Sequence, residues 1–270
     1  MRYIEATLSK DLEYIDLYAV SDIHRGNHKH NEKAWASLLS NIAKDEHAFM
    51  VLNGDLVEAA LKSSKYGDTY RSMPPGEERR QVQRELEAVK SKILCVTAGN
   101  HEARHKDSDE NPAELVADHL GLLDVYDPLS VVLDVNFGSY HGEKDRTTNF
   151  SFYVTHGRGG GRRPGGKINR MQELAWVIEG VDGYIQGHVH DLMSRIEYRN
   201  VADTRNKQVG QRPVAYVVAG SFLDYGDYAE EAGYAPNAVS MPILRLFQKR
   251  RDDEHKHMEI VLPTRIRRAG

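Results

Sequence analysis

Tyr184-Ile185-Gln186-Gly187-His188-Val189-His190 is an apolar run that ends in a glycine and two histidines separated by one residue. A pair of polar, titratable histidines is rarely found in a hydrophobic core. Histidine is, however, a common metal ligand, and alternate residues of an extended chain point in opposite directions, so the pair could serve two adjacent ions. The motif gains weight because four earlier apolar runs end in similar residues: Asp22-Ile23-His24, Gly54-Asp55, Gly99-Asn100-His101 and His156-Gly157.

Strand-like and helix-like segments alternate through the first 190 residues. Short β-rich or apolar runs predict strands, and apolar residues at helical spacing predict helices. The predicted strands are 14–20, 49–52, 93–97, 131–135, 150–154 and 181–186, and the predicted helices are 31–43, 77–90, 112–120 and 168–178. Asn31 and Asn111 are the expected helix caps. Residues 59–76 contain serine, glycine and proline pairs, and we expect a loop that borders a site.

The last third of the chain has a different pattern. Its predicted strands, 195–199, 213–222, 241–248 and 257–262, are joined by polar turns, which favours a meandering antiparallel sheet; the basic tail 264–270 is expected to be loose. No linker is evident, so we expect one domain over 1–270, with the motif-bearing core at 14–190 and a mainly β portion at 191–262. The order of elements predicts an α/β fold with two sheets face to face and helices outside.

Composition excludes several classes of protein. The formal net charge of −4 over 270 residues gives no overall basic signature for nucleic acid. The single cysteine, Cys95, lies in an apolar run and is expected to be buried and without a disulfide. The N-terminus lacks a signal-peptide core, and no apolar run approaches the ~20 residues that span a bilayer. We therefore expect a soluble, cytoplasmic protein with no membrane partner.

The residues that end the apolar runs form a plausible set of metal ligands. Taken singly, each has an ordinary interpretation: Asp22 as a helix cap, Asn100 as a turn residue and His156 as a surface histidine. Five such motifs, each after a strand, favour a shared site, because functional residues of α/β folds collect at the carboxyl ends of strands. Carboxylate, imidazole and amide ligands without thiolate suit Mn²⁺, Fe²⁺ or Zn²⁺, and seven ligands suit two ions that share one carboxylate. The set is Asp22, His24, Asp55, Asn100, His156, His188 and His190.

Three glycines lie beside candidate ligands in this set. They are Gly54, Gly99 and Gly187. Glycine is expected there because it lets the backbone turn sharply and brings the neighbouring side chain to the ions.

In this order, Asp-x-His, Gly-Asp, Gly-Asn-His-Glu, His-Gly and Gly-His-x-His resemble the calcineurin-like metallophosphoesterase superfamily, over roughly Val20 to His190. The resemblance implies a four-layer αββα sandwich with two central mixed β-sheets. It also implies one ion held by Asp22, His24, Asp55 and His190, and a second held by Asp55, Asn100, His156 and His188. One departure is the sequence Gly54-Asp55-Leu56-Val57-Glu58-Ala59-Ala60, which lacks the Arg-Gly of Ser/Thr protein phosphatases and makes a phosphoprotein substrate less expected.

The activity implied by this resemblance is phosphoester hydrolysis by a metal-bound hydroxide that attacks phosphorus, with Asp55 bridging two divalent ions. Mn²⁺ is the favoured ion, with Fe²⁺, Zn²⁺ or Mg²⁺ as alternatives. His101 is expected to protonate or orient the leaving oxygen, and the alternative is a structural role in which it only supports the metal ligands. Each of three arginines follows a ligand motif and could bind a phosphate oxygen, although ordinary surface charge is the alternative. These are Arg25, Arg104 and Arg158.

Residues 157–170 form a basic loop without an acidic residue, and this loop could follow a DNA backbone. It carries no aromatic residue for base stacking, so a solvated loop is the alternative. Its basic residues are Arg158, Arg162, Arg163, Lys167 and Arg170. Farther along, Tyr225, Tyr228 and Tyr234 could form a substrate rim or a dimer surface, with ordinary packing as the alternative.

The predicted substrate is a phosphodiester, either nucleic acid or a nucleotide. The alternatives are a phosphomonoesterase, a nucleotide pyrophosphatase and a non-catalytic metal-binding scaffold. The oligomeric state is not indicated by the sequence.

Overall fold

The structure, a computed structural model, describes residues 1–61, 71–108, 110–138, 148–159, 163–231, 233–249 and 256–263. Its strands are β1 (Arg2–Leu8), β2 (Tyr14–Val20), β3 (Ala48–Asn53), β4 (Ile93–Thr97), β5 (Tyr126–Asp127), β6 (Ser130–Phe137), β7 (Asn149–Thr155), β8 (Gly183–Gln186), β9 (Met193–Asp203), β10 (Gln208–Val218), β11 (Ile243–Phe247) and β12 (Met258–Val261). Its α-helices are α1 (Glu32–Lys44), α2 (Pro75–Leu86), α3 (Pro112–Leu120), α4 (Pro164–Gln172) and α5 (Tyr228–Glu231). Short 3₁₀ segments lie at Glu87–Lys92, Glu102–Ser108, Leu123–Val125 and Glu173–Trp176.

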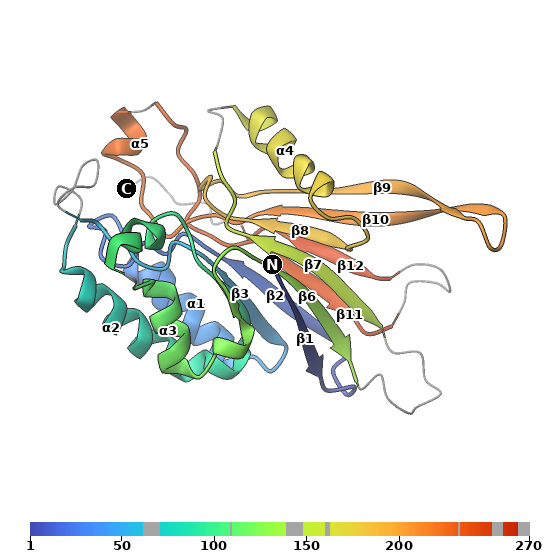
Figure 1. Cartoon of the computed structure of the whole chain (residues 1–270), viewed down its shortest axis with the longest axis horizontal. Coiled ribbons are helices and arrows are strands. Elements are labelled where there is room, and N and C mark those ends of the chain that lie inside the picture. The colour runs from blue at the N-terminus through green and yellow to red at the C-terminus, as the bar shows by residue number, and fades with distance from the viewer. Residues whose placement is uncertain are drawn as a thin grey trace.

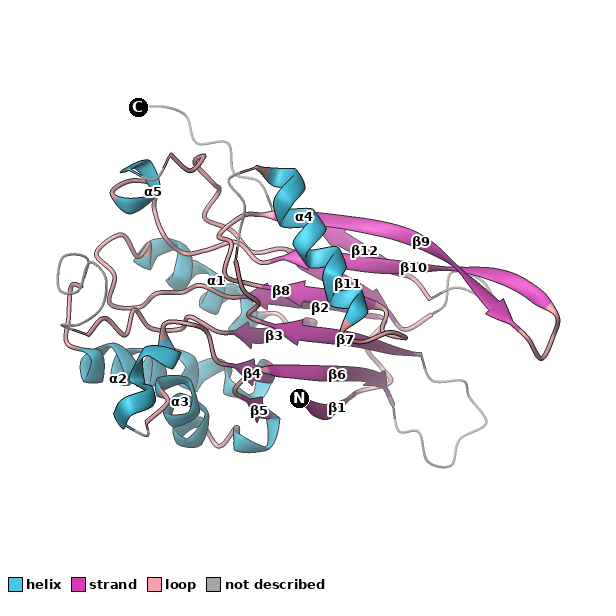
Figure 2. Ribbon diagram, turned by 45° about the horizontal axis from the view of Figure 1, so that its top comes forward, coloured by secondary structure: helices cyan, strands magenta, loops and turns pink. Residues whose placement is uncertain are grey.

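Two mixed sheets form the centre of the molecule (Figures 1 and 2). One sheet has the order β1-β6-β7-β8-β10-β9, and the other has the order β12-β11-β2-β3-β4-β5. Helices α1, α2 and α3 pack on the outer side of the second sheet, and α4 lies over the first (Figure 2). The predicted four-layer α/β sandwich is therefore confirmed.

Two apolar cores explain why the central strands read as continuous hydrophobic runs. The core between the sheets contains Leu17, Val51, Cys95 and Phe152, all fully buried. A second core between β2–β4 and the helices includes Trp35. Because these strands are covered on both faces, neither face needs polar residues. The expected burial of Cys95 is confirmed, and burial raises the pKa of its thiol.

Two helices begin at asparagines whose side chains accept hydrogen bonds from backbone N–H groups of the first turn. Asn31 accepts a hydrogen bond from Ala34 N at 2.9 Å, and Asn111 accepts one from Ala113 N at 3.0 Å, as expected. The predicted helix at 168–178 differs: α4 begins at Pro164, since proline is favoured in the first helical turn, and it ends at Gln172.

The last third of the chain does not form one meandering sheet, and that prediction is wrong. Strands β9 and β10 pair as an antiparallel hairpin at the edge of the first sheet, and this hairpin extends well beyond the sandwich (Figure 1). Strands β11 and β12 belong to the second sheet, where β11 pairs with β2. Polar turns between strands indicate antiparallel pairing but cannot specify which sheet a hairpin joins.

Strand β1 was not predicted, because it is an edge strand in which Ile4 alone is buried. It pairs in parallel with β6. Residues 62–70 of the predicted loop and the tail 264–270 lie outside the described residues. Among the described residues, no helix combines the length and apolar character needed to cross a bilayer.

Candidate metal centre

The seven predicted ligands come from both sheets. Asp22 and His24 follow β2, Asp55 follows β3 and Asn100 follows β4 in one sheet; His156 follows β7, and His188 and His190 follow β8 in the other. Each of these strands ends at the same edge of the sandwich. The structure thus brings together side chains that are up to 168 residues apart, as predicted from their positions after strands.

Five of the seven side chains are carried by backbone in the left-handed region. The φ angles are 53° at Asp22, 49° at His24, 50° at Asp55, 70° at His188 and 48° at His190. This conformation costs a non-glycine residue about 1–3 kcal/mol and is concentrated at functional sites. His188 and His190 therefore reach two different positions through left-handed turns, and not through the extended chain that their alternate spacing suggested.

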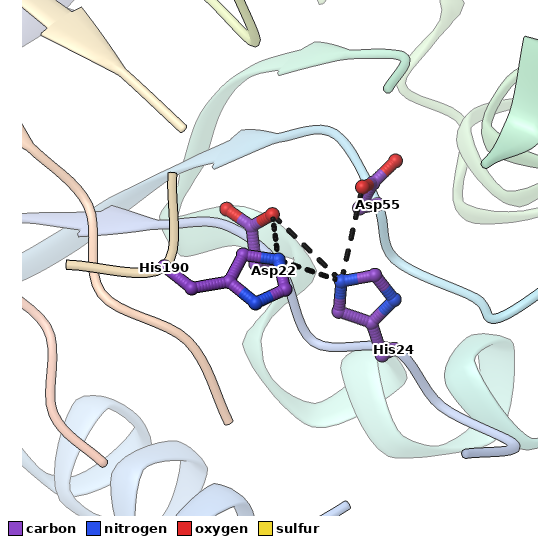
Figure 3. Close-up of side chains that lie close together, drawn as sticks. All are labelled: Asp22, His24, Asp55 and His190. Atoms are coloured by element: carbon purple, nitrogen blue, oxygen red, sulfur yellow. Dashed lines mark hydrogen bonds and ion pairs between the residues drawn. The ribbon is translucent and has the colours of Figure 1, made fainter. Parts of the chain in front are cut away.

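The first group of ligand atoms comes from Asp22, His24, Asp55 and His190 (Figure 3). His190 Nε2 lies 3.0 Å from Asp22 Oδ1, and His24 Nε2 lies 3.1 Å from His190 Nε2. Asp55 Oδ2 is 3.8 Å from His24 Nε2. All four side chains offer one ligand atom within 4.8 Å of the others, which is compatible with a single ion between them.

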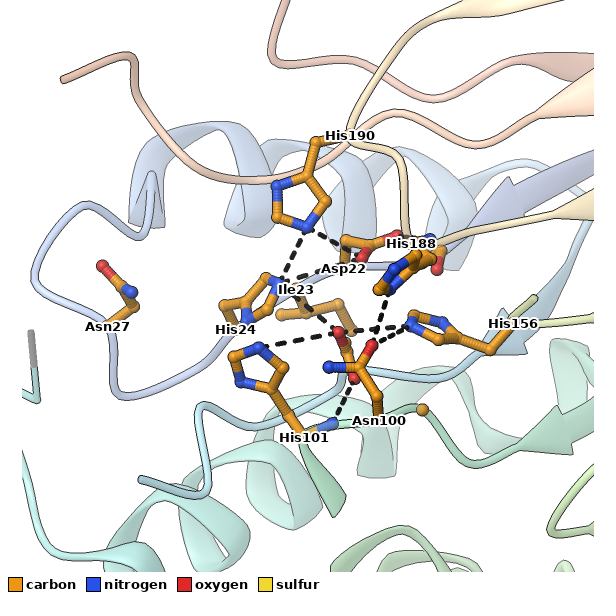
Figure 4. A network of polar contacts seen from close by, with 12 residues as sticks. Asp22, Ile23, His24, Asn27, Asn100, His101, His156, His188 and His190 are labelled. Carbon is orange, nitrogen blue, oxygen red and sulfur yellow. Dashed lines mark hydrogen bonds and ion pairs between the residues drawn. The ribbon is translucent and has the colours of Figure 1, made fainter. Parts of the chain in front are cut away.

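The second group contains Asp55 again, together with Asn100, His156 and His188. The two histidine rings meet at the Asn100 amide oxygen (Figure 4). His156 Nε2 is 3.2 Å from Asp55 Oδ2 and 3.2 Å from Asn100 Oδ1. His188 Nδ1 is 2.6 Å from the same amide oxygen. Asp55 is thus the side chain common to both groups.

The hydrogen bonds of the histidines indicate that a cation fits between these groups. His156 Nδ1 donates to the Asn53 carbonyl at 2.8 Å, and His24 Nδ1 donates to the Glu58 carboxylate at 3.2 Å. Each Nε2 therefore faces carboxylate oxygens and requires positive charge there, either as a proton on the ring or as a cation between the nitrogen and the oxygens. Burial opposes a charge on His156, but Asp55 and Asp22 outweigh it and raise its pKa to about 10.

The Asp22 carboxylate supports the same conclusion. Among the described residues, its buried Oδ1 atom has no hydrogen-bond partner, although His190 Nε2 is only 3.0 Å away. A buried carboxylate oxygen without a donor is costly in a protein unless it binds a cation. The donor set of carboxylate, imidazole and amide oxygen fits divalent ions.

Two glycines allow the ligand loops to approach one another. Gly54 has φ of 78°, and a Cβ atom there would lie 2.6 Å from His156 Nδ1. A Cβ atom on Gly99 would lie 2.1 Å from Asp55 Oδ1. Gly54 therefore has the expected role in a sharp turn. Gly99 is required for a different reason, because a side chain there would not fit between its own loop and the loop of Asp55.

Two glutamates that the sequence interpretation did not assign hold the ligand loops in place. Glu102 is buried, and its two carboxylate oxygens accept hydrogen bonds from the backbone of Asp55, Leu56, Val57 and Gly99 at 2.6–3.3 Å. Glu58 accepts from His24 and so fixes the orientation of its ring. The available signals were the last residue of Gly-Asn-His-Glu and the acidic residue three positions after Asp55.

A cavity of about 450 Å³ opens beside the two groups. His101 lines it; its Nδ1 donates to the Glu58 carbonyl at 2.8 Å, while Arg104 Nη2 donates to its Nε2 at 2.8 Å. Burial and the nearby His24 lower the pKa of His101 to about 4. His101 is therefore held with its ring fixed at the wall of the cavity.

The three predicted phosphate-binding arginines lie in different environments. Arg104 lines the cavity. Arg25 is buried and ion-paired with Glu32 at 2.8 Å and Glu85 at 2.9 Å, so it joins α1 and α2. Arg158 is exposed. Neither Arg25 nor Arg158 is among the described residues that line the cavity.

Two of the basic side chains in the segment 157–170 are paired with carboxylates outside it. Lys167 is buried and bonded to Asp191 at 2.8 Å, and Arg170 is paired with Glu173 at 2.6 Å. Arg163 is exposed and precedes α4. Arg162 lies outside the described residues.

Comparisons with known proteins agree with this geometry. The family model described as calcineurin-like phosphoesterase matches residues 15–192. No curated protein matches the chain.

Three solved structures show a distant likeness to the chain. A conserved uncharacterized protein of Streptococcus pneumoniae, described as a predicted phosphoesterase, is 14% identical with a TM-score of 0.36, and the match covers 93% of this chain and 90% of that one. A metallophosphoesterase of Sphaerobacter thermophilus is 12% identical with a TM-score of 0.39, covering 86% and 83%. Vps29 of Chaetomium thermophilum is 10% identical with a TM-score of 0.37, covering 92% and 96%.

Proposed function

Since the chain belongs to the calcineurin-like phosphoesterase family, we propose that it is a phosphoester hydrolase that uses two divalent metal ions and prefers phosphodiesters of nucleotides or nucleic acids. The observation that carries this proposal is the convergence of seven side chains from both sheets into two groups that share Asp55. Strained backbone at five of them supports a functional role for the whole set.

The proposed ions would be held by the residues of the two groups. Asp22, His24, Asp55 and His190 would hold one ion; Asp55, Asn100, His156 and His188 would hold the other. When bound, such ions stabilise the attacking and leaving oxygens of an in-line displacement and lower the pKa of water. Mn²⁺ is the favoured ion, and Fe²⁺, Zn²⁺ or Mg²⁺ are alternatives with compatible ligand chemistry.

His101 is proposed to act on the leaving oxygen. Its Nδ1 atom donates to the Glu58 carbonyl, so Nε2 is the atom that would act on the leaving oxygen, once it exchanges its hydrogen bond from Arg104 for one with the substrate. Arg104 already donates to this nitrogen and to the Glu58 carbonyl at 3.0 Å, which keeps both side chains beside the metal groups. We propose that Arg104 also contacts a phosphate oxygen of the substrate.

The preference for diesters over monoesters rests on charge. A monoester carries up to two negative charges at neutral pH, and a diester carries one. Three described cationic side chains line the cavity, and each has a carboxylate nearby: Lys29 lies 3.7 Å from Asp227, Arg104 3.5 Å from Glu58 and Lys167 2.8 Å from Asp191. Few positive charges besides the proposed ions are thus available to a dianion, which favours the monoanionic diester.

A panel of esters tests the proposal. With Mn²⁺ present, bis(p-nitrophenyl) phosphate is expected to be hydrolysed with a higher kcat/KM than p-nitrophenyl phosphate, and Asp55→Asn should lose most turnover on both. Asp118→Asn, an exposed change in α3, serves as the matched control and should retain wild-type activity. Bound metal without hydrolysis of any ester would instead support the scaffold alternative.

DNA is a second proposed substrate, supported by the exposed Arg158 and Arg163 in the basic loop. Release of counterions predicts that DNA affinity falls as salt rises, and that Arg158→Gln reduces the slope by about one. Fluorescence anisotropy with labelled single-stranded and double-stranded DNA measures this slope. A flat salt response would leave the loop without a role in DNA binding.

A further inference from the structure

Described residues of the segment 221–237, among them Leu223, Tyr225 and Tyr234, form one wall of the cavity that the metal groups also line. The segment is hydrogen-bonded to the ligand loop: Phe222 N donates to the Asp22 carbonyl at 3.0 Å, and Asp224 N donates to the Lys29 carbonyl at 2.9 Å. Helix α5 and its flanking chain lie on the same side of the sheets as the carboxyl ends of β3 and β8 (Figure 2). The site is therefore bounded by a second wall that is tied to the loop of Asp22 and His24.

This wall presents aromatic and aliphatic surface to the cavity. Tyr225, Tyr234 and Leu223 of this wall line the cavity, and Val189 from the loop of His188 and His190 lines it as well. Tyr225 is 41% exposed, and its hydroxyl donates to the Tyr234 carbonyl at 3.0 Å. The hydrogen bond fixes the tyrosine, while the ring retains a face that a planar group could stack against.

The cationic side chains that line the cavity already have acidic neighbours. Each of its three described cationic side chains has an acidic neighbour: Lys29 lies 3.7 Å from Asp227, and the other pairs are Arg104–Glu58 at 3.5 Å and Lys167–Asp191 at 2.8 Å. A nucleic acid polymer needs several phosphate contacts along its backbone. This cavity offers one strong position for a phosphate, at the metal groups. The described residues that the segment 221–237 contributes to the lining include the carboxylates of Asp224 and Asp227 and no cationic side chain, so this wall does not favour further phosphates.

Resting on the proposed function, we propose that the substrate is a nucleotide-sized phosphodiester whose planar base stacks on Tyr225. The volume of about 450 Å³ lies within the range of small-molecule sites. The single phosphodiester would lie at the metal groups, and the nucleoside would extend toward Tyr225 and Leu223. Tyr225 is thus assigned as a residue that determines specificity for the base.

Equilibrium binding tests this assignment without requiring turnover. Thymidine 5′-monophosphate and methyl phosphate share the phosphate but differ in the nucleoside, so calorimetry on the Mn²⁺-loaded protein gives the ratio of their Kd values. Tyr225→Ala is expected to reduce the preference for the nucleotide by about 5- to 150-fold, the range for one base–aromatic stack. Tyr225→Phe should retain the preference, because it keeps the ring and removes only the hydroxyl.

Tyr198→Ala provides the control, because Tyr198 is a 62% exposed tyrosine on β9 and does not line the cavity. It should leave the ratio unchanged. An unchanged ratio in Tyr225→Ala would overturn the assignment, as would a higher kcat/KM for single-stranded DNA than for the p-nitrophenyl ester of thymidine 5′-monophosphate. If no diester is hydrolysed while the binding preference depends on the Tyr225 ring, the proposed function fails and the assignment of the base-binding wall stands.

Discussion

Replacing Glu102 with glutamine tests whether one buried carboxylate holds the ligand loops together. Its Oε2 accepts from Asp55 N at 3.0 Å and Gly99 N at 2.8 Å, and its Oε1 accepts from the backbone of Leu56 and Val57. In glutamine, one oxygen becomes an NH₂ group, which cannot accept a hydrogen bond. Two buried N–H groups would then lose their acceptor.

The expected cost follows from these two groups. An unsatisfied buried donor costs about 1–3 kcal/mol, so Glu102→Gln should lower the free energy of unfolding by about 2–6 kcal/mol. At roughly 3 °C per kcal/mol for a chain of this size, Tm should fall by about 6–18 °C. Because both loops carry candidate ligands, metal affinity should also fall by roughly 10- to 100-fold.

Circular dichroism and calorimetric titration with Mn²⁺ measure the two effects. Glu114→Gln is the matched control, because Glu114 is exposed in the first turn of α3 and its charge contributes at most about 1 kcal/mol there. If Glu102→Gln unfolds within about 1 kcal/mol of the wild type and binds Mn²⁺ equally well, the argument for the carboxylate as an organiser of both loops is refuted.

Three further predictions concern the ligand loops and the helix beneath them. Gly99→Ala should abolish binding of both ions in a calorimetric titration, since its Cβ would lie 2.1 Å from Asp55 Oδ1; retained stoichiometry of two would contradict the clash. Burial raises the pKa of Glu78 to about 7, so the stability that this group contributes is present below its unfolded pKa of about 4.3 and is lost as pH rises through 7. Urea unfolding should therefore show that raising the pH from 5 to 8 destabilises the wild type by up to about 3 kcal/mol more than Glu78→Gln, and equal losses would exclude this group as the cause. Mn²⁺ at about 100 times its Kd should stabilise the protein by about 2.7 kcal/mol per site, and a Tm that a chelator does not lower would argue against the metal centre.

The sequence predicted the site best where a candidate ligand directly follows a predicted strand. Two sheets with helices outside followed from the order of the predicted strands and helices, and the four-layer sandwich followed from the family resemblance. The convergence of the motif residues followed from apolar runs that each end in a candidate ligand. The sequence did not indicate which of the two sheets each strand of the last third joins, because a turn indicates that its two strands pair but not to which sheet they belong. Likewise, Arg25 follows a ligand motif in sequence, yet its side chain turns to Glu32 and Glu85, which no local pattern indicates.

Residues that organise the site were harder to predict than residues that could bind an ion. Glu102 and Glu58 act through backbone amides and a histidine ring, and these contacts depend on loops brought together by distant strands. The left-handed backbone at Asp22, Asp55, His24, His188 and His190 could not be predicted either, because a positive φ at a non-glycine residue is imposed by the surrounding structure.

The origin of the ligands in two different sheets has a mechanical consequence. Ions coordinated by residues after β2, β3 and β4 on one side and after β7 and β8 on the other would cross-link the two halves of the sandwich at one edge. Sliding of one layer past its neighbour would then require coordination bonds to break. Changes in packing deep between the layers can thus alter how firmly the ions are held, even when no coordinating side chain is touched.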